Sequence, residues 1–158
     1  MALALATGLA LLAALSSTRV LAKELKVSAD IPLKRWVEQA EPHDTLRLAP
    51  GHYATAPVII DKPLSLVADG AGVVIDGGGS GTLLTLRSPD ISLAGLTLQH
   101  WGGDLTAMDA GVHVEKTARG ASIERCRLSG PGFGIWLDGV EDARVLHNQI
   151  RGDTRVRS

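Results

Sequence analysis

Aromatic residues are scarce in this chain of 158 residues: they make up 3% of it, although hydrophobic residues make up 45%. A core without large rings suits a narrow interior filled by Val, Ile, Leu and Ala. Cysteine is nearly absent as well, and a single Cys excludes a disulfide scaffold. An excess of either charge is also lacking. The net charge is −1 and no basic stripe precedes the Arg-rich end, so nucleic acid is not an expected partner.

An apolar run long enough to span a membrane is missing too. The run from Ala2 to Leu15 is too short for a membrane span, but it suits the hydrophobic region of a secretory signal. Val20 and Ala22 supply the small residues that a cleavage site needs. We therefore expect residues 1–22 to be a cleaved signal peptide and the protein to be exported. The alternative is an uncleaved helix at a membrane surface.

One short pattern occurs three times between Thr82 and Gly152. Three sets of apolar residues recur in register: Leu86, Val114 and Leu137; Leu93, Ile123 and Val145; and Leu98, Leu128 and Ile150. The copies are spaced by 22 to 30 residues, and their apolar residues alternate with the period of a strand. Such a repeat is typical of a β-solenoid, in which each coil buries its inward row only between neighbours. The pattern predicts an all-β chain folded as a right-handed parallel β-helix of the pectate-lyase-like kind.

The region before the repeat divides into a predicted cap and less regular first coils. Within residues 23–42, ADIPLKRWVEQAEP predicts a short amphipathic capping helix, with Asp30 as its cap and Leu33 and Val37 on its apolar face. Such a helix would cover the unpaired edge of the first coil. Coils are then expected over residues 43–158. Within them, the DGGG stretch that begins at Asp76 is predicted to be a tight corner, since a strand rather than a helix follows it.

The order of these motifs resembles that of the NosD family. After the signal and the cap helix come TLRLAPGHY, IDKPLSL, VVIDGGGSG, AGVHV, FGIWL and ARVLHNQI, which together are similar to the start of NosD. The resemblance covers nearly everything after the signal. Because members of that family are longer, we expect further coils beyond Ser158.

This resemblance implies a periplasmic accessory function. NosD proteins are right-handed β-helices that work with the membrane and ATPase subunits of an ABC transporter. With these subunits and a copper chaperone, they take part in assembling the copper centres of nitrous oxide reductase. By resemblance, we expect the same partners here, with copper as the metal that is handled.

Copper handling needs thioether, imidazole or thiolate ligands, and the insertion HWGGDLTAMDAG offers two of these types. His100 stands at its entrance, Met108 near its exit and His113 just beyond it, so these three residues are the candidate metal ligands. The alternative is a surface loop without metal, with Trp101 folded over the coil. Cys126 falls in an inward register and is predicted to fill core space.

An outward row of residues suggests a competing function. Arg87, Glu115 and Asp138 occupy one row on successive coils, beside His113 and Trp136. Paired carboxylates next to an exposed ring would suit a protein that binds, cleaves or epimerises a polysaccharide. The same row can equally be a solvated charge ladder. We expect no catalysis from this segment and assign no catalytic residue.

A third interpretation is a stiff scaffold that docks a protein partner. Trp101, Phe133 and Trp136 are the apolar side chains that we expect to be exposed at such an interface. Nothing in the sequence excludes this role.

Overall fold

A computed structural model describes residues 21–55 and 57–153 of the chain. It contains one helix, α1 (Leu33–Gln39), among these residues. The strands are β1 (Glu24–Val27), β2 (Thr45–Leu48), β3 (Gly51–Ala54), β4 (Val58–Ile60), β5 (Ser65–Ala68), β6 (Val73–Asp76), β7 (Leu84–Leu86), β8 (Ser92–Ala94), β9 (Thr97–Gln99), β10 (Ala110–Val114), β11 (Ser122–Glu124), β12 (Arg127–Gly130), β13 (Phe133–Leu137), β14 (Arg144–Leu146) and β15 (Gln149–Gly152). Nearly all of the predicted signal peptide lies outside the described residues. No helix within them is long and apolar enough to cross a membrane.

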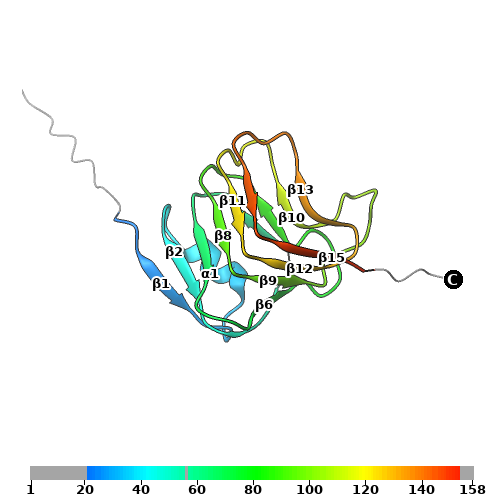
Figure 1. Ribbon diagram of the computed structural model, residues 1–158. Helices are drawn as coiled ribbons and strands as arrows, with labels where there is room; N and C mark the ends of the chain where they lie inside the picture. The colour runs from blue at the N-terminus through cyan, green and yellow to red at the C-terminus, as the bar shows by residue number, and fades with distance from the viewer. Residues whose placement is uncertain (1–20, 56, 154–158) are drawn as a thin grey trace, which may run out of the picture.

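The strands form three parallel sheets that wind around one core (Figure 1). Sheet A has the order β1-β2-β5-β8-β11-β14, sheet B the order β15-β12-β9-β6-β3, and sheet C the order β13-β10-β7-β4. From β2 onward the chain visits sheets A, B and C in turn, so each circuit makes one coil. The expected parallel β-helix is confirmed.

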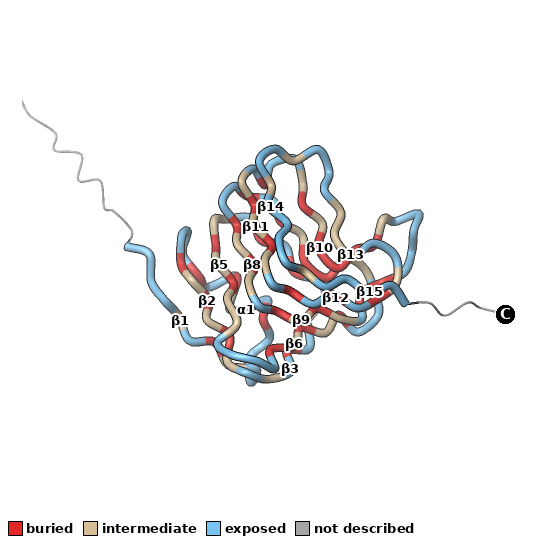
Figure 2. The backbone as a smooth tube through the Cα atoms, viewed as in Figure 1, coloured by how far each residue is buried: buried red, intermediate tan, exposed pale blue. Residues whose placement is uncertain are grey.

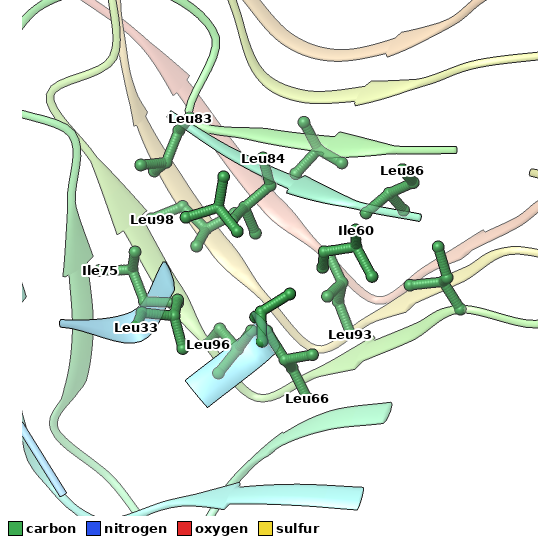
Figure 3. Close-up of a cluster of buried hydrophobic side chains, with 14 of the residues drawn as sticks. Leu33, Ile60, Leu66, Ile75, Leu83, Leu84, Leu86, Leu93, Leu96 and Leu98 are labelled. Carbon is green, nitrogen blue, oxygen red and sulfur yellow. The ribbon is translucent and has the colours of Figure 1, made fainter. Parts of the chain in front are cut away.

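The register between coils is the one that the sequence repeat predicts. Strand pairing aligns Leu86 with Val114 and Leu137, Leu93 with Ile123 and Val145, and Leu98 with Leu128 and Ile150. Leu86, Leu93 and Leu98 are fully buried and belong to a single hydrophobic cluster (Figure 3). Stacking like residues over like therefore builds the core.

The residues of β14 and β15, on the last described coil, are exposed (Figure 2). Ile123 and Leu128 are 1% exposed, whereas Val145 and Ile150, at the same places one coil later, are 38% and 49% exposed. The residues differ little in chemistry, so the presence of a coil on both sides decides whether each is buried.

The helix α1 packs its apolar face against the core, as predicted. Leu33 and Val37 are buried in the same cluster as Ile75 of β6 and Leu96, which lies between β8 and β9. Figure 3 shows Leu33, Ile75 and Leu96 within this cluster. Asp30, however, is not the cap: Pro32 holds that position with an extended backbone and no side-chain hydrogen bond. The region 23–42 also contains β1, which pairs with β2 and was not anticipated.

The carboxyl end of α1 is held by a lysine from the coil that follows. Lys62 Nζ donates hydrogen bonds to the carbonyl oxygens of Glu38 (3.2 Å) and Ala40 (2.9 Å). These carbonyls have no partner within the helix, and a cation suits the negative end of the helix dipole.

Trp101 corrects another expectation, because it is buried rather than exposed. Only 1% of it is exposed, and its Nε1 donates a hydrogen bond to the carbonyl oxygen of Pro131. Its ring lies against Gly111 and Gly130, where an added Cβ would come within 3.0 Å and 2.8 Å of ring atoms. Two glycines, one on β10 in sheet C and one on β12 in sheet B, thus make room for one indole that covers the coil.

This packing predicts that Gly130→Ala destabilises the fold. We expect the free energy of unfolding to fall by about 1–3 kcal/mol, the usual cost of overpacking a filled site. Gly152→Ala is the matched control, since a Cβ there would meet no atom within 4 Å. That control should stay within about 0.5 kcal/mol of the parent chain. Urea unfolding of the two variants measures the difference, and equal stability would contradict the proposed packing of Trp101.

Candidate functional site

Two histidines from different coils meet at one carboxylate on sheet B. Asp76 ends β6, His52 lies on the neighbouring β3, and His100 follows β9 on the other side. The Oδ2 atom of Asp76 lies 3.3 Å from Nε2 of His52 and 2.7 Å from Nδ1 of His100. Three coils thus contribute one residue each, and we call this group the histidine–aspartate cluster.

The carboxylate of Asp76 is fixed by further donors. Gln99 Nε2 donates to Oδ2 at 2.8 Å, and the backbone N–H of Gly78 donates to Oδ1 at 2.9 Å. Burial raises the pKa of Asp76, but hydrogen bonds from Gln99, Gly78 and His100 outweigh it and bring the pKa down to about 2. The group is therefore negatively charged at neutral pH.

The backbone around the cluster follows from the glycine corner. Gly78 and Gly79 have φ values of 66° and 86°, which confirms the predicted tight corner after β6. The N–H of Gly79 donates to the carbonyl oxygen of His100 at 2.6 Å, and His100 itself has a φ of 54°. The corner of one coil thereby holds the histidine of the next in a left-handed conformation, aimed at Asp76.

An ionised Asp76 determines which ring nitrogens remain available. A carboxylate accepts hydrogen bonds only, so Nδ1 of His100, 2.7 Å from Oδ2, carries the proton that faces it. Nε2 of His100 is therefore the nitrogen of that ring that can bind a metal ion. Nε2 of His52 lies 3.3 Å from the same carboxylate oxygen. The side chains of His52 and His100 are 59% and 65% exposed, so solvent and ligands reach them.

This chemistry matches the outer shell of many metal sites, in which a carboxylate orients a ligating imidazole. Imidazole nitrogens bind borderline cations such as copper and zinc. Among residues 21–55 and 57–153, no group of three or more His, Cys, Asp or Glu residues is placed to hold a metal ion. The cluster therefore offers two imidazoles beside one carboxylate and not a closed coordination shell.

The predicted metal ligands are separated by the fold. His100 belongs to the cluster on sheet B, whereas His113 lies on β10 in sheet C. Met108 sits in the loop between them, half-buried, with its N–H bonded to the carbonyl oxygen of Leu105 at 3.3 Å. In the described part of the chain no hydrogen bond, ion pair or ring contact joins any two of the three.

His52 and Asp76 were missed because the first coils are irregular in sequence. The strand register that aligns β3 with β6, and β6 with β9, is visible only in the structure. A usable signal did exist, since His52, Asp76 and His100 are spaced by 24 residues each, close to the length of one coil.

Sheet C carries an aromatic face. The ring of His113 stacks on that of Trp136 with centroids 4.2 Å apart, and Phe133 lies 6.3 Å from Trp136. Phe133 is 38% exposed and Trp136 is half-buried, so both reach the surface as predicted. We call Phe133 and Trp136 the aromatic face. Leu137, the next residue on β13, belongs to the inward row with Val114 and points to the other side of the sheet.

The charged row beside this face is partly paired. Arg87 holds Glu115 through two hydrogen bonds of 2.8 Å and 2.9 Å. These bonds, and the positive charge of Arg87, lower the pKa of Glu115 despite some burial. Nε2 of His113 lies 3.5 Å from Oδ2 of Asp138 and makes no hydrogen bond. The charge-ladder interpretation fits Arg87 and Glu115.

Cys126 fills core space, as its register predicts. It is 1% exposed, and burial raises the pKa of its thiol. Its backbone N–H donates to Oδ1 of Asn148 on the next coil at 2.8 Å. A buried thiol with a raised pKa is a poor nucleophile and a poor metal ligand.

Comparison with known proteins finds relatives that all carry the name NosD. No protein-family model matches the chain. The chain is 50% identical over 111 residues to the probable ABC transporter binding protein NosD of Pseudomonas aeruginosa, which covers 70% of this chain and 26% of that protein. It is 40% identical over 120 residues to the NosD protein of Stutzerimonas stutzeri, covering 76% of this chain and 27% of that protein.

A further NosD protein of Pseudomonas aeruginosa is 39% identical over 83 residues, which are 52% of this chain and 74% of that protein. The chain spans about a quarter of the length of the first two relatives.

Solved structures agree on the fold. An alginate lyase of the PL6 family, AlyGC, superposes with a TM-score of 0.59 at 17% identity, over 85% of this chain and 22% of the lyase. A point mutant of the same lyase superposes with a TM-score of 0.63 at 19% identity, over 81% of this chain and 20% of the lyase. At such identities the likeness concerns the parallel β-helix alone.

The state of Asp76 predicts a dependence of stability on pH. Its pKa is about 2 when folded, against an ordinary value of 3.8, so its contribution to stability is present above about pH 4 and lost as the pH falls towards 2. Between pH 5 and 2 we expect the parent chain to lose on the order of 1–2 kcal/mol more than Asp76→Asn. Urea unfolding across this range measures both, and parallel pH profiles would contradict the arrangement.

Proposed function

This chain belongs to the NosD family, and from that membership we propose that it is a periplasmic accessory protein of an ABC transporter, acting in the assembly of the copper centres of nitrous oxide reductase. Its partners would be the membrane and ATPase subunits of the transporter, the reductase and a copper chaperone. The observation that carries the proposal is the identity to proteins named as ABC transporter binding proteins.

Docking is supported by the aromatic face on sheet C. Phe133 is 38% exposed, and its ring centroid lies 6.3 Å from that of the half-buried Trp136 on the same strand, β13. Large aromatic side chains at a surface are the usual anchors of protein interfaces. The stack on His113 holds the Trp136 ring in one orientation, which lowers the entropy lost on binding.

Copper, as the transported cargo, would be accepted at the histidine–aspartate cluster. Asp76 orients the imidazole of His100 through a hydrogen bond and lies 3.3 Å from that of His52. Both histidine side chains are more than half exposed, so a donor or acceptor protein can reach them. A protein that passes a metal on must also release it. Two imidazoles without a third ligand suit this task better than a closed site, because the partner can complete and then take over the coordination.

No catalytic step is assigned to this segment. A general acid in polysaccharide chemistry needs a carboxyl group with a raised pKa, whereas the ion pair with Arg87 lowers that of Glu115. This pairing favours the accessory function over the polysaccharide alternative.

Substitution of the aromatic face should weaken retention of the transporter. We expect Trp136→Asp to reduce co-purification of the membrane subunit by at least about tenfold, since a buried Trp anchor often contributes more than 1.4 kcal/mol. Ile31→Asp, at another exposed apolar position before α1, is the control and should bind normally. Circular dichroism of both variants verifies that they fold. Equal retention of Trp136→Asp and the parent chain would count against this face.

A further inference from the structure

The arginines of the chain differ in their partners. Eight lie within the described residues, and four of them form ion pairs with carboxylates: Arg47, Arg87, Arg119 and Arg125. Arg127 on β12 and Arg151 on β15 make no ion pair and no side-chain hydrogen bond with any residue that the structure describes. Both are exposed on the outer face of sheet B.

The strand register brings these two arginines together. β12 and β15 run side by side (Figure 1), with Arg127 opposite Gln149 and Ser129 opposite Arg151. The arginines therefore sit at diagonal corners of a four-residue patch, and Ser129 and Gln149 occupy the other two corners. Together with Thr97 on β9, these four residues line a shallow hollow of about 310 Å³. We call this the arginine patch.

Two acidic residues, Asp153 and Asp76, lie near the patch, and among the described residues neither forms an ion pair with Arg127 or Arg151. Asp153 follows Arg151 by two residues along the chain. Asp76 aligns with Gln99, and Gln99 aligns with Ser129, so Asp76 lies two strands away from the patch on sheet B. Its oxygens accept hydrogen bonds from Gln99 and Gly78, and Oδ2 contacts His100 and His52. Two guanidinium groups on adjacent coils thus stand side by side without a carboxylate partner among the described residues, although like charges so close repel each other.

From this arrangement we propose that the arginine patch binds an acidic, extended segment of a protein partner. Guanidinium groups pair with carboxylates through two parallel hydrogen bonds, which makes them selective for planar anions. Adjacent strands lie roughly 4.8 Å apart and two residues span roughly 6.6 Å, so the arginine Cα atoms are about 8 Å apart. Carboxylates on alternate residues of an extended peptide have nearly the same spacing, also roughly 6.6 Å.

The polar corners add a reason to choose a peptide. Ser129, Thr97 and Gln149 supply hydroxyl and amide groups that can donate to backbone carbonyls and accept from backbone N–H groups. An extended peptide offers both kinds of group between its acidic side chains. The inference rests on the proposed function, because it takes the partner to be a protein. It adds a second contact with that partner, made by arginines on sheet B rather than by the aromatic face on sheet C.

A peptide-binding assay tests this site without the transporter. The probe is a fluorescent peptide in which Glu alternates with Ser, and the comparison peptide has Gln in place of Glu. Fluorescence anisotropy measures the affinity for the whole chain at low and high salt. We expect the acidic peptide to bind, the Gln peptide not to bind, and the affinity to fall with salt.

Two double variants with equal change of charge localise the effect. Arg127→Glu/Arg151→Glu should lose at least about tenfold in affinity, because it removes both guanidinium groups that would pair with the carboxylates of the peptide. Arg35→Glu/Arg144→Glu, which reverses two other exposed and unpaired arginines, should stay within about twofold of the parent chain. Arg127→Lys/Arg151→Lys should keep the charge but lose part of the affinity, since Lys cannot pair bidentately.

Several outcomes would overturn the proposal. These are equal losses in the two Glu variants, unchanged binding in Arg127→Glu/Arg151→Glu, or binding of an acidic oligosaccharide where the peptide does not bind. Because the assay contains no transporter, such a result would leave the retention experiment with Trp136→Asp unaffected. Conversely, loss of the transporter interaction would not remove peptide binding.

Discussion

The structure depends on the stacking of coils in register. Each coil has an inward row of aliphatic side chains that one coil cannot bury alone. Ile123 is 1% exposed between two coils, whereas Val145, at the same place on the last coil, is 38% exposed. Backbone pairing in parallel and the packing of like residues over like act together, because a slip by one residue would turn every inward side chain outward. The aromatic-poor composition is a consequence, since a narrow core has no space for many rings.

Register also creates the surface chemistry. Residues that are 24 positions apart in sequence become neighbours, so His52, Asp76 and His100 meet, although no local motif joins them. The same stacking places Trp136 on His113 and brings Arg127 near Arg151. A rigid scaffold thereby presents three different sites on its outer surface: imidazoles on a carboxylate, an aromatic face and an arginine patch. Corners with left-handed residues, such as His100, set where the side chains point.

Coils were expected from residue 43 onward, but only the register of the later coils could be predicted from sequence. Between Thr82 and Gly152 the repeat is regular enough to give the registers of Leu93, Ile123 and Val145 correctly. Earlier strands lack that regularity, so the partners of His52 remained hidden. Trp101 was expected to be exposed at an interface, or else folded over the coil, and the structure shows the second. Two glycines on neighbouring coils make room for its ring, which only three-dimensional packing reveals. Pro32 rather than Asp30 occupies the N-cap position, because α1 begins at Leu33, later than the position of Asp30 suggests.

An anaerobic titration with cuprous ion against a chromophoric chelator tests most directly whether the stacked coils build a copper-accepting cluster. The decisive variant is His52→Asn/His100→Asn, since Asn tolerates the left-handed backbone at His100 and ligates copper poorly. His43→Asn/His147→Asn, at two other exposed histidines, is the control, and Met108→Ala/His113→Ala tests the ligands suggested by sequence alone. We predict that the parent chain, His43→Asn/His147→Asn and Met108→Ala/His113→Ala bind cuprous ion. His52→Asn/His100→Asn should not bind it. Binding that survives in His52→Asn/His100→Asn would contradict the assignment of copper to this cluster.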